Sequence, residues 1–250
     1  MLEHHDSGPL RTLKLARPPV NALHVPMFEA LGAAVRAAPG EGARGLVLTG
    51  GGKLFSAGLD VAVLAGLDAA SLKAFLGSFF TCLRTLAESP LPIVAAINGH
   101  SPAGGAVLAL FCDQRIMARG DFRIGLNEVQ VGLLPGPLIY GVLKRAVSLR
   151  VANQMLPQGL LLTPDEALAA GLVDELAEPA ELEGRAHAWL ERVLALPPVA
   201  YATTRAMVRA DLVAMMAEAT RRDPNEMIEA WMGAETRASL AALVAKLGRK

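Results

Sequence analysis

The sequence predicts an α/β protein in which helices cover a set of strands, because short apolar runs alternate with segments of helical periodicity. Residues 9–16 alternate apolar and polar positions as a half-exposed strand does, and residues 25–38 then space their apolar residues as a helix does. Short apolar strands are predicted at 45–51 and 91–97, separated by a helix over 67–87. Pro18 and Pro19 end the first strand, and the strands at 45–51 and 91–97 run into glycine before the next helix, which is typical of repeated strand–helix units.

The remainder of the chain is predicted to be mainly helical. Pro197 and Pro198 interrupt this part, and no strand-like run follows them. We therefore expect residues 1–196 to form the core and residues 197–250 to form a helical region. The individual predictions after Gly136 are a helix pair over 138–156, a helix from Thr163 to Gly171, a short strand at 172–176, and helices at 179–195, 199–222 and 224–247.

Composition narrows the class of protein. Apolar residues make up 52% of the 250 residues, which is enough for a large core, and the formal net charge is zero. No basic patch indicates nucleic acid, no apolar run is long enough to cross a membrane, and the N-terminus lacks the pattern of a signal peptide. Cys82 and Cys112 lie in apolar surroundings, as buried thiols of a reducing compartment do. We expect a cytoplasmic protein.

The stretch from Leu91 to Gly136 carries the clearest chemical signal. Pro102, Ala103, Gly104 and Gly105 open a segment rich in Ala, Leu and Val, which predicts a buried helix with almost no side chains around its N-terminus. Such a helix start offers unpaired N–H groups and the positive end of the helix dipole to a developing negative charge. Farther along, Glu128 is an acid set among apolar residues, which are Leu126, Val129, Val131, Leu133 and Leu134.

A second glycine-containing loop lies at residues 53–61, with the sequence KLFSAGLDV. Gly58 and its small neighbours allow backbone N–H groups to approach a ligand closely. Gly50-Gly51-Gly52-Lys53 lacks the spacing of a phosphate-binding loop, and no metal or flavin motif is present. His4 and His5 lie at a terminus without a predicted element, and we do not expect them to bind a metal.

Three blocks of the sequence resemble the enoyl-CoA hydratase/isomerase (crotonase) superfamily. They are FSAGLDV at 55–61, AAINGHSPAGGAVLALFCDQRIMA at 95–118 and IGLNEVQVGLLPG at 124–136. Within the superfamily, PPVNAL, SPAGG and GLNEVQVGL most resemble the mitochondrial-type Δ3,Δ2-enoyl-CoA isomerases. The resemblance implies a crotonase-like spiral of ββα units followed by a helical region that drives trimerisation. It also implies a homotrimer or a dimer of trimers, an acyl-CoA thioester as substrate, and no cofactor beyond the coenzyme A of that substrate.

The resemblance assigns roles to individual residues. Leu59 and Gly104 match the two positions whose N–H groups form the oxyanion hole of the family, with Gly105 as an adjacent alternative. Glu128 matches a catalytic glutamate. The positions implied to bind the substrate or its coenzyme A moiety are Ser56, Ala57, Gly58, Asp60, Gly105 and Asn127.

One departure from the family pattern directs the functional prediction. Hydratases of the family use two glutamates, and here Val107 stands at the position of the first while Glu128 matches the second. A single carboxylate is sufficient for a 1,3-proton shift, and an apolar setting raises its pKa. We therefore expect an enoyl-CoA isomerase of fatty-acid β-oxidation.

Three alternatives remain open at this point. A hydratase, or another acyl-CoA enzyme of the same fold, could activate water with a residue from elsewhere in the chain. A dienoyl-CoA isomerase is disfavoured because Val107 and Gly136 occupy the positions where further acids would be sought. A protein of another class, an inactive acyl-CoA-binding trimeric scaffold, is disfavoured by the retained Glu128 and glycine loops.

Overall fold

A six-stranded sheet forms the centre of the computed structural model, which describes residues 1–247. Only the first pair of strands is antiparallel, and the other neighbours in the sheet run parallel. The strand order is β1 (Leu2–Ser7), β2 (Leu10–Leu15), β3 (Gly45–Gly50), β4 (Ile93–Ile97), β6 (Gln114–Ala118) and β9 (Glu175–Ala177). A smaller sheet joins β5 (Ser101–Pro102), β7 (Ile124–Gly125) and β8 (Leu161–Leu162).

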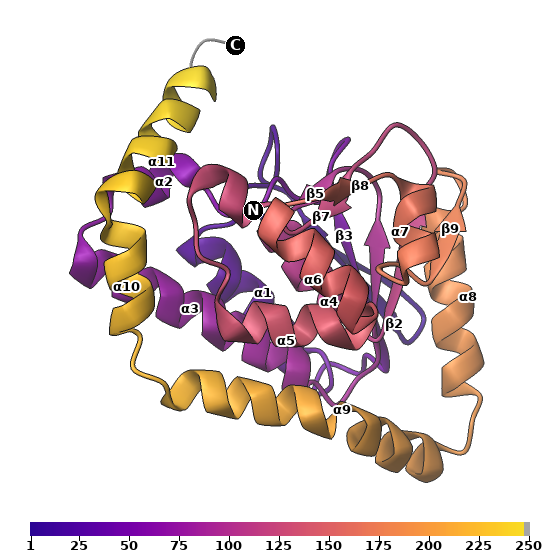
Figure 1. Cartoon of the computed structure of the whole chain (residues 1–250). Helices are drawn as coiled ribbons and strands as arrows, with labels where there is room; N and C mark the ends of the chain where they lie inside the picture. The colour runs from indigo at the N-terminus through magenta and orange to yellow at the C-terminus, as the bar shows by residue number, and fades with distance from the viewer. Residues whose placement is uncertain (248–250) are drawn as a thin grey trace.

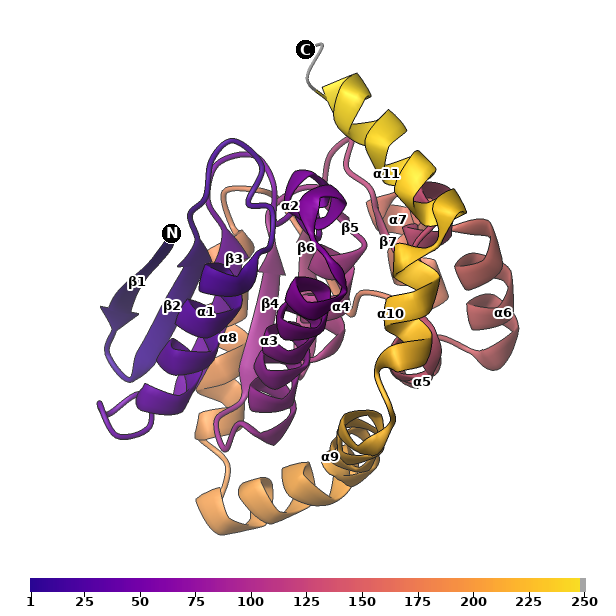
Figure 2. The same ribbon diagram turned by 90° about the vertical axis from the view of Figure 1, so that its left-hand side faces the viewer.

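Helices cover both faces of the large sheet, as Figure 2 shows. Leu46 and Leu48 of β3 belong to the main apolar core under α1 (Val25–Ala37) and α3 (Ala69–Glu88). Val47 points to the opposite face and packs with the side chains of α8 (Leu182–Leu194). This alternation explains why the central strands are continuous apolar runs, since both of their faces are buried.

Five strands, two short helices and one break among the described elements are absent from the sequence-based prediction. The strands are β1, β6 and the three strands of the smaller sheet, and the helices are α2 (Val61–Gly66) and η1 (Glu128–Val131). β1 is exposed along most of its length, so its polar sequence LEHHDS shows no apolar alternation even though it pairs with β2. The buried helix α4 (Gly104–Leu110) is short, and β6 follows it without a turn signal that the sequence makes obvious. The single helix predicted over 224–247 is instead divided at Gly233 into α10 (Asn225–Met232) and α11 (Ala234–Leu247).

The other predicted elements are confirmed with small shifts of their ends. The helix pair after Gly136 is α5 (Gly136–Ala146) and α6 (Leu149–Gln158), and α7 (Pro164–Ala170) begins with the capping box of Thr163 and Glu166. Cys82 and Cys112 are buried free thiols, and burial raises the pKa of each to about 12. Within residues 1–247 no helix has the length and apolarity that crossing a membrane requires.

The C-terminal helices wrap around the core and return to it. α9 (Pro198–Arg221) runs along one side of the molecule, and α10 and α11 then turn back so that α11 lies beside α2 (Val61–Gly66), as Figure 1 shows. Two partly buried ion pairs fasten α9, because Arg205 donates two 2.8 Å hydrogen bonds to the Asp113 carboxylate and Arg209 donates one of 3.1 Å. The division of the chain into a core of residues 1–196 and a helical region of residues 197–250 stays a prediction.

Candidate active site

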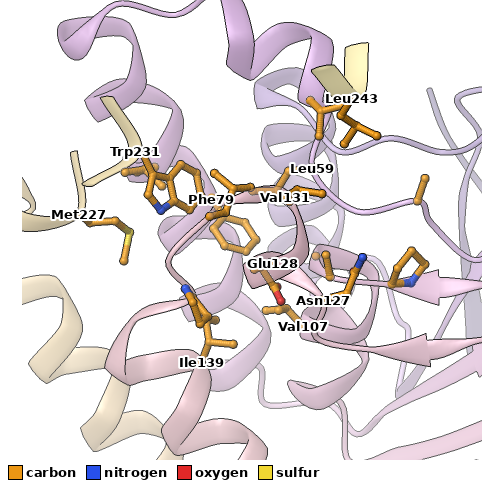
Figure 3. A pocket seen from close by; sticks show the side chains of 18 of the residues that line it. Leu59, Phe79, Val107, Asn127, Glu128, Val131, Ile139, Met227, Trp231 and Leu243 are labelled. Atoms are coloured by element: carbon orange, nitrogen blue, oxygen red, sulfur yellow. The ribbon is translucent and has the colours of Figure 1, made fainter. Parts of the chain in front are cut away.

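A cavity of about 120 Å³ lies where the two glycine loops meet the returning C-terminal helices. Its walls are mostly apolar, and Figure 3 shows the side chains that line it. Elements distant in sequence contribute to it, since Leu59 precedes α2, Phe79 belongs to α3, and Val107 belongs to α4. Trp231 of α10 and Leu243 of α11 complete the wall.

Glu128 places a carboxyl group in this apolar space. The residue begins the short 3₁₀ helix η1 (Glu128–Val131), and only 7% of it is exposed. Its Oε2 atom is buried and has no hydrogen-bond partner within residues 1–247. Burial disfavours the ionised form and raises the pKa of Glu128 to about 7. A carboxyl with this pKa takes up and releases protons readily near neutral pH, as a general base must.

Asn127 supplies a second polar group to the cavity. Its Oδ1 atom is buried and, among the described residues, finds no donor. Figure 3 shows Asn127 and Glu128 near Val107, on the same side of the cavity. Buried polar atoms in folded proteins are nearly always paired, so adjacent unpaired oxygens at one cavity indicate a place where a ligand binds.

The backbone of the first glycine loop leaves the Leu59 amide free. The Leu23 N–H donates to the Gly58 carbonyl and the Asp60 N–H donates to the Leu23 carbonyl, each at 2.8 Å. Because this parallel bridge uses the groups on either side of Leu59, the Leu59 N–H is turned away from it. Within residues 1–247, the Leu59 N–H donates to no protein acceptor.

The Gly104 amide lies next to that of Leu59. Gly104 is the first residue of α4, so its N–H has no partner inside the helix, and none elsewhere in residues 1–247. A Cβ atom added to Gly104 would lie 3.3 Å from the Leu59 nitrogen, which shows how closely the two backbones approach. Ala103, which precedes the helix, has a φ of +46° and makes the sharp turn into it. The two free N–H groups can bind one oxygen that acquires negative charge.

Glycine is required at two positions of this arrangement. Gly58 has a φ of +86°, and a Cβ atom there would lie 3.1 Å from the Gly104 nitrogen. A Cβ atom on Gly105 would lie 2.8 Å from the Ser56 carbonyl oxygen. Larger residues would therefore push the two loops apart.

Ser56 and Asp60, which are also predicted to bind the substrate, are not among the residues that line the cavity. Ser56 is fully buried, and its hydroxyl donates to the Asn21 carbonyl at 2.8 Å and accepts from the Gly58 N–H at 3.1 Å. Asp60 accepts from two N–H groups at the start of α2 and pairs with Arg17 at 2.7 Å. Burial alone would raise the pKa of Asp60, but the hydrogen bonds and Arg17 outweigh it and lower that pKa. These side chains hold the loop that carries Leu59.

Five of the predicted site residues thus lie at the wall of one cavity: Ala57, Leu59, Gly104, Asn127 and Glu128. That any of them contacts coenzyme A stays a prediction. The sequence analysis did not place the aromatic and aliphatic side chains of α3, α10 and α11 there. Trp231 is one of them, and its Nε1 donates to the Leu134 carbonyl at 3.0 Å. No local motif marks such residues, because they reach the site only through the packing of elements that are distant in sequence.

Val107 faces the cavity from α4, at the position where a second acid was considered. Among the described residues that line the cavity, Glu128 is the only carboxylate. The site therefore combines two backbone donors, one carboxyl group and a largely apolar wall. Such a site can stabilise an enolate-like oxygen and move a proton on a neighbouring carbon.

Comparison with known proteins identifies the family of the chain. The family model described as enoyl-CoA hydratase/isomerase matches residues 7–247. The human mitochondrial enoyl-CoA delta isomerase 1 is 33% identical over 213 residues, which are 84% of this chain and 70% of the human protein. A probable enoyl-CoA hydratase of Mycolicibacterium paratuberculosis is 32% identical over 225 residues, 90% of this chain and 87% of the relative. Identity alone therefore does not separate the two activities.

A solved structure confirms the predicted crotonase fold. The crystal structure of human mitochondrial delta3-delta2-enoyl-CoA isomerase superposes with a TM-score of 0.94 at 28% identity, covering 99% of this chain and 98% of that one. The α/β core and the helical C-terminal region thus both have counterparts there, while the predicted trimer stays a prediction. From the family model, the relatives and the shared fold, the chain belongs to the enoyl-CoA hydratase/isomerase family and is an acyl-CoA enzyme of that fold.

Proposed function

We propose that the protein is a Δ3,Δ2-enoyl-CoA isomerase, which moves the double bond of a 3-enoyl-CoA to the 2-trans position. The observation that carries the proposal is the single carboxylate of the cavity, Glu128, with an apolar residue, Val107, where a second acid would stand. The reaction moves one proton between two carbons and causes no net oxidation. It therefore requires a base and an oxyanion hole, and the only coenzyme involved is the coenzyme A of the substrate.

In the proposed mechanism the thioester oxygen accepts hydrogen bonds from the Leu59 and Gly104 amides. Ionised Glu128 removes a proton from C2, the C2–H electron pair enters the conjugated system, and a dienolate forms with its charge on the thioester oxygen. The protonated carboxyl then returns the proton to C4, which leaves the double bond between C2 and C3. Loss of one oxyanion donor typically costs about 3 kcal/mol of transition-state stabilisation, so both amides are important to the rate.

Hydration is the second candidate, and it is favoured by the relatives named as probable hydratases. Adding water across the double bond needs a group that orients and activates a water molecule. Val107 cannot hydrogen-bond to water, and the neighbouring wall of Phe79 and Val131 is apolar as well. These residues support isomerisation over hydration.

We also propose that the substrate belongs to fatty-acid β-oxidation and that the protein is a homotrimer, with a dimer of trimers as the larger assembly. Apolar side chains on α9 support self-association, since Val199 is 78% exposed, Met207 70% and Val208 62%. Light scattering of the purified protein measures the assembly, and a monomer would contradict this part of the proposal.

The direct test supplies 3-hexenoyl-CoA and follows formation of the conjugated 2-hexenoyl thioester, with the product identified by NMR. We expect rapid conversion to 2-trans-hexenoyl-CoA. Binding of the thioester without conversion would contradict the isomerase and favour another acyl-CoA chemistry or the inactive scaffold.

A further inference from the structure

The two chemical halves of the site lie on separate segments that α11 joins. Leu59 lies two residues before the first residue of α2, whereas Glu128 begins η1. α11 packs against both α2 and η1, and its place beside α2 is visible in Figure 1. We propose that two consecutive residues of α11, Thr236 and Arg237, are positioning residues that hold the Glu128 turn and the Leu59 loop at the separation that proton transfer requires.

Thr236 fastens the Glu128 side of the site. Its side chain is buried, and its hydroxyl lies 2.6 Å from the Gly132 carbonyl oxygen and 3.1 Å from that of Ala230. Gly132 ends η1 with a φ of +72°, and a Cβ atom there would lie 3.3 Å from the Thr236 Cα. The turn that begins with Glu128 therefore ends directly against α11, with a glycine that permits the close approach.

Arg237 fastens the oxyanion side. Its guanidinium donates to the Leu64 carbonyl at 3.2 Å, to the Ala65 carbonyl at 2.9 Å, and to the Leu67 carbonyl. These carbonyls lie at the C-terminal end of α2, where helical partners run out and positive charge is favoured. At its other end α2 is capped by Asp60, the residue after Leu59. Arg237 is thus connected to the Leu59 amide through one short helix.

Adjacency in sequence makes the pair suited to this role. Successive side chains of an α-helix point about 100° apart, so Thr236 and Arg237 reach two different walls from the same turn. A displacement of α11 moves both walls, and a misplacement of about 1 Å at reacting groups can cost on the order of 10²-fold in rate. Trp231, which lines the cavity and bonds to the Leu134 carbonyl, adds a third attachment just before α11.

The first experiment removes the Thr236 hydroxyl with little change of shape. Thr236→Val is expected to lower kcat for 3-hexenoyl-CoA isomerisation about tenfold while KM changes less than twofold, because the carboxylate is misplaced and binding is kept. Thr236→Ser, which restores the hydroxyl, should recover most of the rate. Thr220→Val is the matched control, since it removes a hydroxyl that donates to the Met216 carbonyl at 2.7 Å within α9. It should leave kcat unchanged.

The second experiment concerns Arg237 and the link between the two residues. Arg237→Gln should lower kcat about tenfold, with partial recovery in Arg237→Lys, whose ammonium can still reach some of the α2 carbonyls. If both residues fix one separation, the double variant Thr236→Val/Arg237→Gln loses less than the product of the single effects. A purely multiplicative loss, a change in KM alone, or failure of Thr236→Ser to recover the rate would overturn the proposal.

This inference rests on the proposed use of Glu128 and the two amides, and one further assay separates it from the isomerase assignment. Exchange of the C2 protons of butanoyl-CoA with D₂O requires the base and the oxyanion donors but no double-bond shift. Slower exchange in Thr236→Val, with a wild type that exchanges but does not isomerise, would support the positioning role and refute the isomerase. Unchanged exchange in an isomerising enzyme would refute the positioning role alone. A wild type that does neither would contradict both proposals.

Discussion

Two walls of the cavity, formed by α4 and by η1, are built in opposite ways. All seven residues of α4 are buried and uncharged, and this wall offers a backbone N–H from Gly104 and a methyl surface from Val107. On the other wall, η1 is buried only at Glu128, which supplies a carboxyl group. The main-chain donors cannot titrate and depend only on backbone position. The carboxyl titrates, and burial controls its pKa.

This contrast predicts that the two walls fail differently when they are altered. Changes on the α4 side and its partner loop should act through geometry and leave the pH dependence unchanged. Changes at Glu128 should alter the pH dependence of both activity and stability.

Replacement of the carboxylate should have the largest effect. Glu128→Gln keeps the size of the side chain but removes the base, and we expect kcat/KM for isomerisation to fall about 10³-fold. Glu29→Gln is a matched control because Glu29 is exposed on α1. A Glu128→Gln variant that keeps more than a tenth of the wild-type rate would show that another group is the base.

A change in the backbone wall should cost about 10²-fold in kcat/KM, as the loss of an oxyanion donor does. Gly58→Ala forces a side chain onto a residue with a φ of +86° and places its Cβ 3.1 Å from the Gly104 nitrogen. Gly77→Ala, in α3, is the control, because a Cβ there meets nothing within 4 Å. The comparison of walls further requires that the midpoint of the pH–rate profile is the same in Gly58→Ala and the wild type. A shifted midpoint would mean that the two walls are not independent.

The buried carboxyl of Glu128 should also change how the free energy of unfolding depends on pH. Its pKa of about 7 in the folded protein exceeds its ordinary value of 4.5, so the unfolded chain ionises first as the pH rises. This group therefore lowers the free energy of unfolding progressively from about pH 4.5 and fully above about pH 7. When the pH is raised from 5 to 8, the free energy of unfolding of Glu128→Gln should increase by about 2 kcal/mol relative to that of the wild type. Urea unfolding at the two pH values measures this difference. An equal difference at both pH values would place Glu128 in an ordinary, solvated environment.

The raised pKa of Glu128 should also have a smaller effect, on the pH dependence of the wild-type rate. Glu128 acts as a base when ionised, so kcat/KM should rise with pH through a midpoint near 7. The expected increase between pH 6 and pH 8 is about tenfold, which follows from a single ionisation. Stopped-time assays of 3-hexenoyl-CoA across this range measure it. A midpoint near 4.5, or a rate that falls with pH, would contradict the assigned role.

Features that are encoded within a single loop or helix could be predicted well from the sequence. The glycine loop at Gly58, the bare helix start at Gly104 and the acid at Glu128 could be identified because each has a local pattern. Their meeting at one cavity followed from the family resemblance, and the structure brings all three segments together.

Features that depend on distant partners could not be predicted in the same way. β1 is a strand because it pairs with β2, although its own residues are polar and exposed. Thr236 and Arg237 have no local signal, since their roles depend on carbonyl groups of η1 and α2 far away in the sequence. The break at Gly233 separates α10, which carries Trp231, from α11, which carries Thr236 and Arg237.

The most direct test of the central claim, that one carboxylate serves this site, measures isomerisation and hydration side by side. Purified protein receives 3-hexenoyl-CoA in one assay and crotonyl-CoA in the other, and Val107→Glu is treated identically. The account predicts isomerisation at least about 10²-fold faster than hydration in the wild type, and a ratio that shifts toward hydration when Val107→Glu supplies a second acid. Hydration of crotonyl-CoA by the wild type at a comparable rate would contradict it, and would mean that a second group activates water in this cavity.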